Sequence, residues 1–219
     1  PGRDILVLDG SGLTLDLTGI ADSDLVGIET IDITGSGDNT LVLDRLEVLN
    51  SSGTSNTLSV IGNAGDGVVI VLDGDWTRTG TESFSGASFA VLANGSALLR
   101  LDTRLDVQVQ LPGNGKTHVA TWADDQVTVA DIEGDNSLVL DMDLWDSNTI
   151  LGSDVDDHLT VDLANSDFLP IDGLSFADAT GNDDDTIGFQ DSLGETYVTA
   201  HWTLTDSDTA VGDRDGWAV

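Results

Sequence analysis

One short pattern recurs along the chain: a polar turn that runs straight into a short apolar segment. It reads GDNTLVLD at residues 37–44 and GDNSLVLD at residues 134–141, two copies whose first residues lie 97 positions apart (134 − 37). Looser copies occupy residues 55–60, 156–162 and 184–189. A turn and a strand repeated in this way are the signature of coiled β-architectures, in which each repeat buries its apolar face against the next. The pattern therefore predicts an all-β fold, and within that class a parallel β-solenoid.

Between these copies, apolar residues follow the two-residue period of a β-strand. Residues 13–18 (LTLDLT) and 28–34 (IETIDIT) alternate apolar and polar side chains, as a half-buried strand does. No segment keeps the 3.6-residue period of an amphipathic helix, so we expect very little helix. Residues 45–49 (RLEVL) fit either one helical turn or a strand.

Corresponding apolar positions in successive copies are widely spaced, which favours coils over hairpins. A β-sandwich would also supply short strands, but at intervals of about 8–12 residues joined by hairpin turns. We interpret each of the following intervals as one coil: 17 positions from Leu41 to Leu58, 21 from Leu138 to Leu159 and 28 from Leu159 to Ile187.

The chain divides into two related halves. Residues 73–110 bring in aromatic side chains and alternating segments, and we interpret them, residues 105–110 included, as antiparallel strands added to the first coils. Residues 111–117 (LPGNGKT) are rich in turn formers and make the best boundary. We therefore predict a solenoid-like half with side strands at residues 1–111 and a second solenoid-like half at residues 112–219.

The charge balance is extreme, because 40 acidic residues face 7 basic ones and give a formal net charge of −33. Nucleic acids and anionic membrane surfaces are bound through clustered Lys and Arg, so neither is expected as a partner. Since 39% of residues are apolar and the acids lie between apolar runs, we expect a folded chain with an anionic surface rather than disorder. Salt or bound cations must screen that surface, which favours a marine or saline habitat, calcium binding, or both.

Further absences narrow the possible functions. The chain contains no cysteine, which excludes disulfides, thiolate metal sites and cysteine nucleophiles. No apolar run approaches the ~18 residues of a membrane-spanning helix, so no membrane span is expected. The sequence starts at Pro1 without a methionine or a signal peptide, which we interpret as a mature, excised or partial product.

Aspartate-rich turns are the candidate metal sites. Residues 35–41 and 181–187 resemble fragments of the calcium-binding nonapeptide G-G-x-G-x-D-x-U-x, in which turn carbonyls and aspartates supply hard oxygen ligands. The competing interpretation is that such aspartates only hydrogen-bond the backbone of their own turns. The candidate calcium ligands are Asp154, Asp156, Asp157, Asp183, Asp184 and Asp185.

Catalysis is not expected. Among 40 acids, carboxylate pairs arise by chance, so they do not indicate glycoside hydrolysis. The basic residues are scattered, apart from Arg100 and Arg104, whereas a β-helical polysaccharide lyase needs a basic residue beside its acids. We interpret His118, His158 and His201 as structural or surface residues, because they lack metal-ligand spacing.

The tryptophans allow two interpretations. Exposed tryptophans would stack on sugar rings, and buried ones would fill the core or close the ends of the fold. We favour the second for the five tryptophans Trp76, Trp122, Trp145, Trp202 and Trp217.

Two stretches resemble repeats of very large bacterial surface proteins. Residues 15–67 are similar to modules of repeats-in-toxin-type adhesins, and residues 157–189 are similar to repeats of planctomycete-type surface proteins. The first resemblance is carried by residues 16–19 (DLTG), 27–37, 39–43, 48–49, 56–60 and 62–66, followed by Trp76. The second is carried by residues 157–162, Pro170, residues 173–174, Phe176 and residues 181–183. The resemblance implies β-solenoid stalks in tandem arrays, often stiffened by calcium, that serve in adhesion or as surface fibres.

From the residues and the resemblance together we expect a structural role. The chain would be a segment of a bacterial cell-surface protein or extracellular fibre, secreted, rigid and anionic, associating end to end with copies of itself or with neighbouring modules. The alternative is a carbohydrate-binding adhesin module that uses its tryptophans and calcium-bearing loops. A polysaccharide lyase is the third and least favoured hypothesis.

Overall fold

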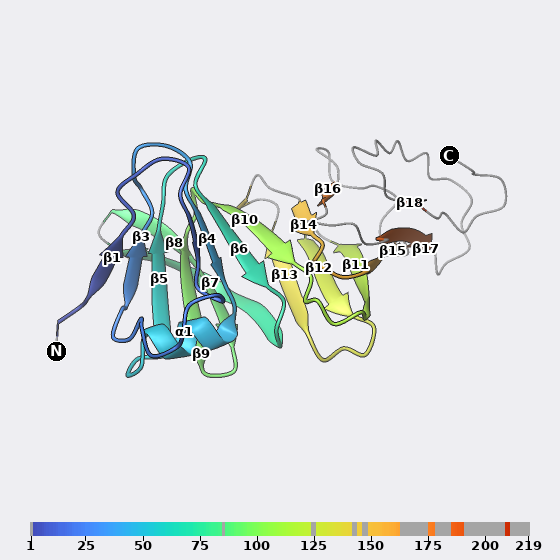
Figure 1. The fold of residues 1–219 in the computed structure, drawn as a ribbon, viewed down its shortest axis with the longest axis horizontal. Coiled ribbons are helices and arrows are strands. Elements are labelled where there is room, and N and C mark those ends of the chain that lie inside the picture. Colours follow the sequence, from blue (N-terminus) through green and yellow to red (C-terminus); the bar gives the residue numbers. More distant parts are fainter. Residues whose placement is uncertain are drawn as a thin grey trace.

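A computed structural model describes residues 2–84, 86–123, 126–141, 144–145, 149–162, 175–177, 185–190 and 209–210. Strands dominate the described residues, which contain one short helix, and they form two sheets (Figure 1). The expected all-β class is therefore confirmed. No helix in the described part of the chain is long and apolar enough to cross a membrane.

The larger sheet is mixed and has twelve strands. Its pairings are parallel at both ends and include two antiparallel blocks, β7–β8–β9 and β11–β12–β13. In spatial order it contains β1 (Ile5–Val7), β3 (Thr30–Asp32), β5 (Thr57–Ile61), β9 (Ala97–Asp102), β8 (Ala87–Asn94), β7 (Asp75–Phe84), β13 (Ser137–Asp141), β12 (Gln126–Asp131), β11 (Thr117–Ala123), β15 (His158–Asp162), β17 (Thr186–Gln190) and β18 (Thr209–Ala210).

The smaller sheet has six strands, and every pairing in it is parallel. In spatial order it contains β16 (Ser175–Ala177), β14 (Thr149–Leu151), β10 (Asp106–Gln110), β6 (Gly67–Val71), β4 (Thr40–Leu43) and β2 (Thr14–Asp16).

From β1 to β6 the chain alternates between the two sheets, one strand in each. We call one strand of the larger sheet plus the next strand of the smaller sheet a circuit. Successive circuits stack in register, so that Leu15 lies beside Leu41, and Leu41 beside Val68. One circuit therefore takes 26 (41 − 15) or 27 (68 − 41) residues here.

This geometry corrects two of the three intervals that we interpreted as coils. Leu41 and Leu58 lie in different sheets, so their 17-residue spacing spans part of a circuit. Leu138 and Leu159 share the larger sheet but are separated by β12 and β11. Only the 28-residue interval joins direct partners, Leu159 and Ile187. The error arises because the same turn-and-strand pattern occurs in both sheets, and the sequence pattern does not show which sheet a given copy joins.

The core lies between the sheets and is built from alternate residues of their strands. Leu41 and Leu43 of β4, and Val68 and Ile70 of β6, have no exposed surface. Leu58 of β5 is equally buried on the facing sheet. These residues belong to one cluster of buried side chains, so the stacked circuits share one continuous core. Burial of this kind stabilises the fold by about 25 cal/mol for each Å² of apolar surface removed from water.

Residues 45–49, which fitted either a helical turn or a strand, lie in α1 (Arg45–Ser51). Asp44 caps its N-terminus, because the Asp44 Oδ1 accepts a hydrogen bond from the Glu47 N–H at 3.0 Å. At the other end, the Ser52 hydroxyl donates to the Val48 carbonyl at 2.8 Å. The cap and the buried Val48 fix the helix against the core.

The predicted side strands are confirmed in part. β7, β8 and β9 pair antiparallel, as expected. The antiparallel prediction for residues 105–110 is wrong, because β10 pairs parallel with β6 and with β14. An alternating pattern sets which face is buried but not the direction of the neighbouring strand. Both sheets continue across residue 111, through the β10–β14 and β7–β13 pairings, and the two-half division stays a prediction.

Candidate functional site

The corners between the sheets are held by buried amide and carboxylate side chains. Asn39, just before β4, is 1% exposed. Its Oδ1 accepts the Leu13 N–H of the preceding circuit at 2.9 Å. Its Nδ2 donates to the carbonyls of Gly10 and Ile33, at 3.1 and 3.0 Å. One side chain therefore ties the turn of one circuit to the turn of the circuit before it.

Asp66 repeats this arrangement one circuit later, just before β6. Its carboxylate is fully buried and accepts the backbone N–H groups of Asn39 at 2.9 Å and of Asn63 at 2.8 Å. Hydrogen bonds from backbone N–H groups offset the cost of burying a charged carboxylate. The side chains of Asn39 and Asp66 thus form a ladder in which each binds the corner backbone one circuit earlier, that of Leu13 and that of Asn39.

The same ladder reappears among the predicted calcium ligands. Asp157 precedes β15 and Asp185 precedes β17, and both are buried. The Asp157 N–H donates to the Asp185 Oδ1 at 2.8 Å, and the Ser153 N–H donates to the Asp157 Oδ2. Asp185 therefore binds the backbone of Asp157 as Asp66 binds the backbone of Asn39, although β15 and β17 belong to the larger sheet and β4 and β6 to the smaller one.

Gly152 allows these two carboxylates to approach the same point. A Cβ on Gly152 would lie 2.9 Å from the Asp185 Oδ2 and 3.2 Å from the Asp157 Oδ2.

The structure describes only some of the other candidate calcium ligands. Asp154 and Asp156 are exposed, and Asp183 and Asp184 lie outside the described residues. Within the described residues, no group of three or more acidic or histidine side chains is arranged to hold a metal ion. Calcium binding stays a prediction.

The first circuit forms an edge of both sheets. Among the described strands, β1 pairs only with β3, and β2 pairs only with β4. The Asp4 carbonyl and the Leu8 N–H bond to the β3 segment, the latter at 2.8 Å from the Asp32 oxygen. Because bonding sides alternate along a parallel strand, the N–H groups of Ile5 and Val7 point away from β3.

Apolar side chains of this first circuit remain in contact with water. The exposed fractions are 56% for Ile5, 57% for Val7 and 42% for Leu13, and Leu6 and Leu15 are only partly buried. Of these side chains, Leu6 and Leu15 face the core. The positions stacked on Leu6 are Ile31 and Val60, those stacked on Leu15 are Leu41 and Val68, and all four are at most 1% exposed. The apolar core is therefore open at the N-terminal end of the molecule, where Figure 1 places β1 outermost.

Two acids near α1, the buried Glu47 and the half-buried Asp73, were missed by sequence reasoning. Burial, with the nearby carboxylates of Asp44, Asp22 and Asp16, raises the pKa of Glu47 to about 7. Burial also raises the pKa of Asp73 to about 6, although its Oδ1 accepts the Arg45 N–H at 3.0 Å. Residues 44–47 (DRLE) ahead of an apolar run resemble a capping box, the signal that could have located Glu47.

Two basic residues, Arg104 and Lys116, are partners of buried acids. The Arg104 guanidinium donates two hydrogen bonds to the carboxylate of the buried Asp102, from Nε at 2.9 Å and from Nη2 at 2.6 Å. The Lys116 Nζ lies 3.4 Å from a carboxylate oxygen of the buried Asp131, whose pKa is held below its usual range by hydrogen bonds and this cation, against the effect of burial. Arg100 instead pairs with Glu82, so the Arg100/Arg104 grouping does not form a shared basic site.

The structure places several residues that sequence analysis singled out. Trp76 and Trp145 are buried, at 0% and 2% exposure, which confirms the core interpretation for these two. His118 is also buried, and desolvation lowers its pKa. His158 is exposed and contacts the Thr186 hydroxyl. The side chains of Trp122, Trp202, Trp217 and His201 lie outside the described residues.

Comparison of the chain with protein-family models, with curated proteins and with solved structures finds no match.

Proposed function

We propose that this chain is a structural segment of a secreted bacterial surface protein or extracellular fibre: a β-solenoid rod that lengthens by stacking further circuits on its open end. Three features support the solenoid. The chain alternates between two sheets, successive circuits lie in parallel register, and Asn39 and Asp66 tie one corner to the next.

The open first circuit is the single observation that carries the structural role. An edge strand with outward backbone N–H groups and uncovered apolar side chains is a template for another strand. A further circuit, from a second copy or a neighbouring module, would cover Leu6 and Leu15 as later circuits cover Leu41 and Leu43. Repeat proteins that stand alone need a polar cap at such an end.

The anionic surface fits a rod in salty surroundings. With a net charge of −33, neighbouring copies repel one another unless salt shortens the range of the repulsion. At physiological ionic strength the Debye length is about 8 Å, so apolar contact at the open end can outweigh repulsion between distant acids. This supports a marine or saline habitat and an extracellular location.

Sedimentation velocity over a range of concentrations, at 150 mM salt, tests the proposal. The variant Val7→Pro removes an outward N–H without breaking a bond to β3, whereas Val7→Thr keeps that N–H and the branched shape. We expect the chain and Val7→Thr to associate as concentration rises, and Val7→Pro to remain monomeric with an unchanged thermal melt. A chain that stays strictly monomeric at high concentration contradicts end-to-end association.

A further inference from the structure

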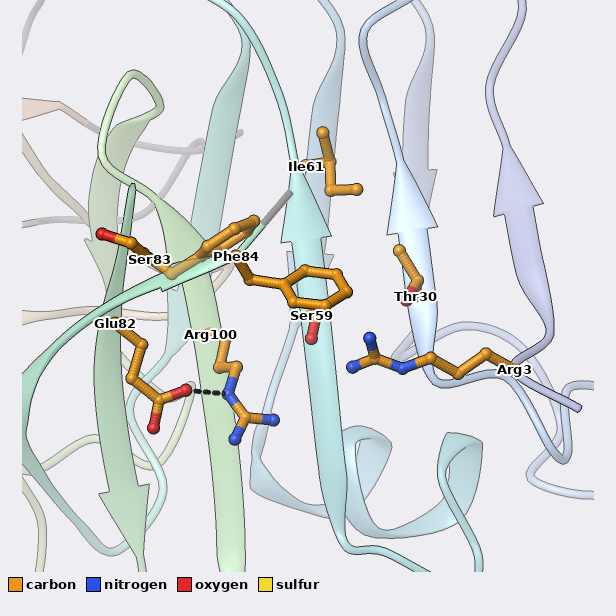
Figure 2. A pocket seen from close by; sticks show the side chains of 9 residues that line it. Arg3, Thr30, Ser59, Ile61, Glu82, Ser83, Phe84 and Arg100 are labelled. Atoms are coloured by element: carbon orange, nitrogen blue, oxygen red, sulfur yellow. Dashed lines mark hydrogen bonds and ion pairs between the residues drawn. The ribbon is translucent and has the colours of Figure 1, made fainter. Parts of the chain in front are cut away.

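A groove lies on the outer face of the larger sheet, beneath the tip of the β7–β8 hairpin (Figure 2). Thr30, Ser59 and Arg100 form a row across β3, β5 and β9, because Thr30 pairs with Ser59 and Ser59 with Arg100. Their neighbours along each strand fill the core, so this row faces outward. Ser83 and Phe84 of the hairpin overhang the row, and the groove encloses about 240 Å³.

The groove floor is covered although it faces away from the core. Thr30 is 5% exposed and Ser59 is 6% exposed. Their hydroxyls are donors and acceptors that a ligand in the groove could reach. Phe84 contributes an aromatic ring that is 55% exposed at the groove rim.

Two guanidinium groups converge on this groove from opposite sides. Arg3 lies with its guanidinium carbon 4.9 Å from the centre of the Phe84 ring. The Arg100 Nε donates to the Glu82 Oε2 at 2.8 Å, and Figure 2 shows the Arg100 guanidinium on the side of the groove opposite Arg3. Among the described residues, Arg3 makes no ion pair, and Arg100 makes only the ion pair with Glu82. The charged residues that line the groove are Arg3, Arg100 and Glu82, and their charges sum to one positive charge.

That local charge selects the ligand. One positive charge balances one carboxylate, and a guanidinium binds a carboxylate through two parallel N–H donors. A polyanion would meet the remaining acids of a chain whose net charge is −33, so it is excluded. Hydroxyls beside an exposed aromatic ring suit the hydroxyls and apolar ring face of a sugar.

We propose that this groove binds a monocarboxylated sugar of the uronic acid class. Its carboxylate accepts hydrogen bonds from Arg3 and Arg100, its hydroxyls bond to Ser59 and Ser83, and its ring lies against the exposed side of Phe84. The inference goes beyond the structural role, since it gives the rod a binding site on its side rather than at its end.

Salt dependence distinguishes this groove from an ordinary basic patch. At 10 mM salt the Debye length is about 30 Å, so distant acids repel an approaching carboxylate, whereas at 150 mM it is about 8 Å and the two guanidinium groups dominate. Affinity should therefore rise between 10 and 150 mM salt, opposite to the fall that a basic patch gives.

Isothermal titration calorimetry and NMR titration of the full chain with glucuronate test the proposal. Glucose lacks the carboxylate and acetate lacks the ring, and we expect each to bind at least about tenfold more weakly than glucuronate. Arg3→Gln should weaken glucuronate binding by about tenfold or more, as expected for a charge-assisted hydrogen bond. Arg78→Gln makes the same change in net charge on β7 outside the groove lining, and it should leave affinity unchanged.

Three results would overturn the proposal. Glucuronate could fail to bind at 150 mM salt, acetate could bind as tightly as glucuronate, or Arg78→Gln could weaken binding as much as Arg3→Gln. Because Arg3 is exposed near the N-terminus, its substitution should leave the thermal melt unchanged. Failure here leaves end-to-end association untouched, since neither Arg3 nor Phe84 contributes to the backbone edge of β1.

Discussion

At the residue scale, Asn39 holds the stack together through three hydrogen bonds made with side-chain atoms that are buried. An amide suits this place because its oxygen accepts and its nitrogen donates. Asp66, one circuit later, receives only backbone N–H donors, which suits a carboxylate that only accepts. The choice between Asn and Asp at each corner therefore follows the backbone groups that surround it.

Replacing Asn39 tests this corner. Asn39→Ala leaves the Leu13 N–H and the Gly10 and Ile33 carbonyls without that partner, and buried groups left unsatisfied cost about 1–3 kcal/mol each before relaxation. We expect a loss of about 2–4 kcal/mol in the free energy of unfolding, measured by urea denaturation. Asn114→Ala, in an exposed turn, is the control and should cost less than ~1 kcal/mol. Equal losses of unfolding free energy for the two variants would mean that the buried hydrogen bonds of Asn39 do not stabilise the stacked circuits.

Glu47 predicts a pH dependence of stability. Its pKa is raised from 4.5 to about 7 in the folded chain, so the folded state holds a proton that the unfolded state has released. This contribution is complete below pH 4.5 and is lost as pH rises to 7, and Asp73 acts with the same sign between 3.8 and about 6.

Glu47→Gln keeps the shape and removes the titration. At pH 8 this variant should be more stable than the unmodified chain by about 1–2 kcal/mol, and its stability should change less between pH 5 and 7. Thermal melts at a series of pH values measure both effects. Glu133→Gln changes an exposed acid and should keep the original pH profile. Glu47 would not be a buried, proton-holding acid if the two variants gave the same profile.

At the element scale, the repeated GDN motif shows what sequence reasoning can reach. Both copies form a turn that runs into a strand, β4 and β13, as predicted. In both, the asparagine Oδ1 accepts a backbone N–H from the adjoining strand segment, Leu13 for Asn39 and Gly74 for Asn136. Yet β4 lies between two parallel neighbours, whereas β13 has one antiparallel and one parallel neighbour. Local residues specify turn and period, and the partner strand is chosen by distant packing.

The α1 cap gives an element-scale prediction. Asp44→Ala removes the acceptor for the Glu47 N–H and should cost about 1 kcal/mol, whereas Asp44→Asn still caps the helix and should cost much less. Because the Asp44 charge contributes to raising the pKa of Glu47, Asp44→Asn should also lower that pKa. Chemical denaturation gives the first result and NMR titration of the Glu47 side chain gives the second. A loss as large for Asp44→Asn as for Asp44→Ala would show that capping is not the source.

At the scale of the whole molecule, the sequence predicted the class of fold more securely than its winding. Apolar alternation located most strands in the described residues, but the circuit length was misread, since Leu41 and Leu58 belong to opposite sheets. The groove was not predicted at all, because Arg3, Ser59 and Arg100 lie far apart in sequence and meet only when β5 pairs with β9 and the hairpin folds over them.

The net charge of −33 predicts that salt stabilises the whole chain. Raising NaCl from 10 to 150 mM shortens the Debye length from about 30 to about 8 Å, so repulsion among exposed acids falls while short buried contacts keep their strength. We expect the midpoint of thermal unfolding to rise with NaCl, and CaCl2 at equal ionic strength to give a similar rise if screening alone acts. An extra calcium effect that a chelator reverses and Asp185→Asn abolishes would instead identify the Asp157–Asp185 corner as a metal site, because screening depends on ionic strength and not on one buried carboxylate. No rise with either salt would contradict the argument that repulsion across the anionic surface lowers the stability of the folded chain.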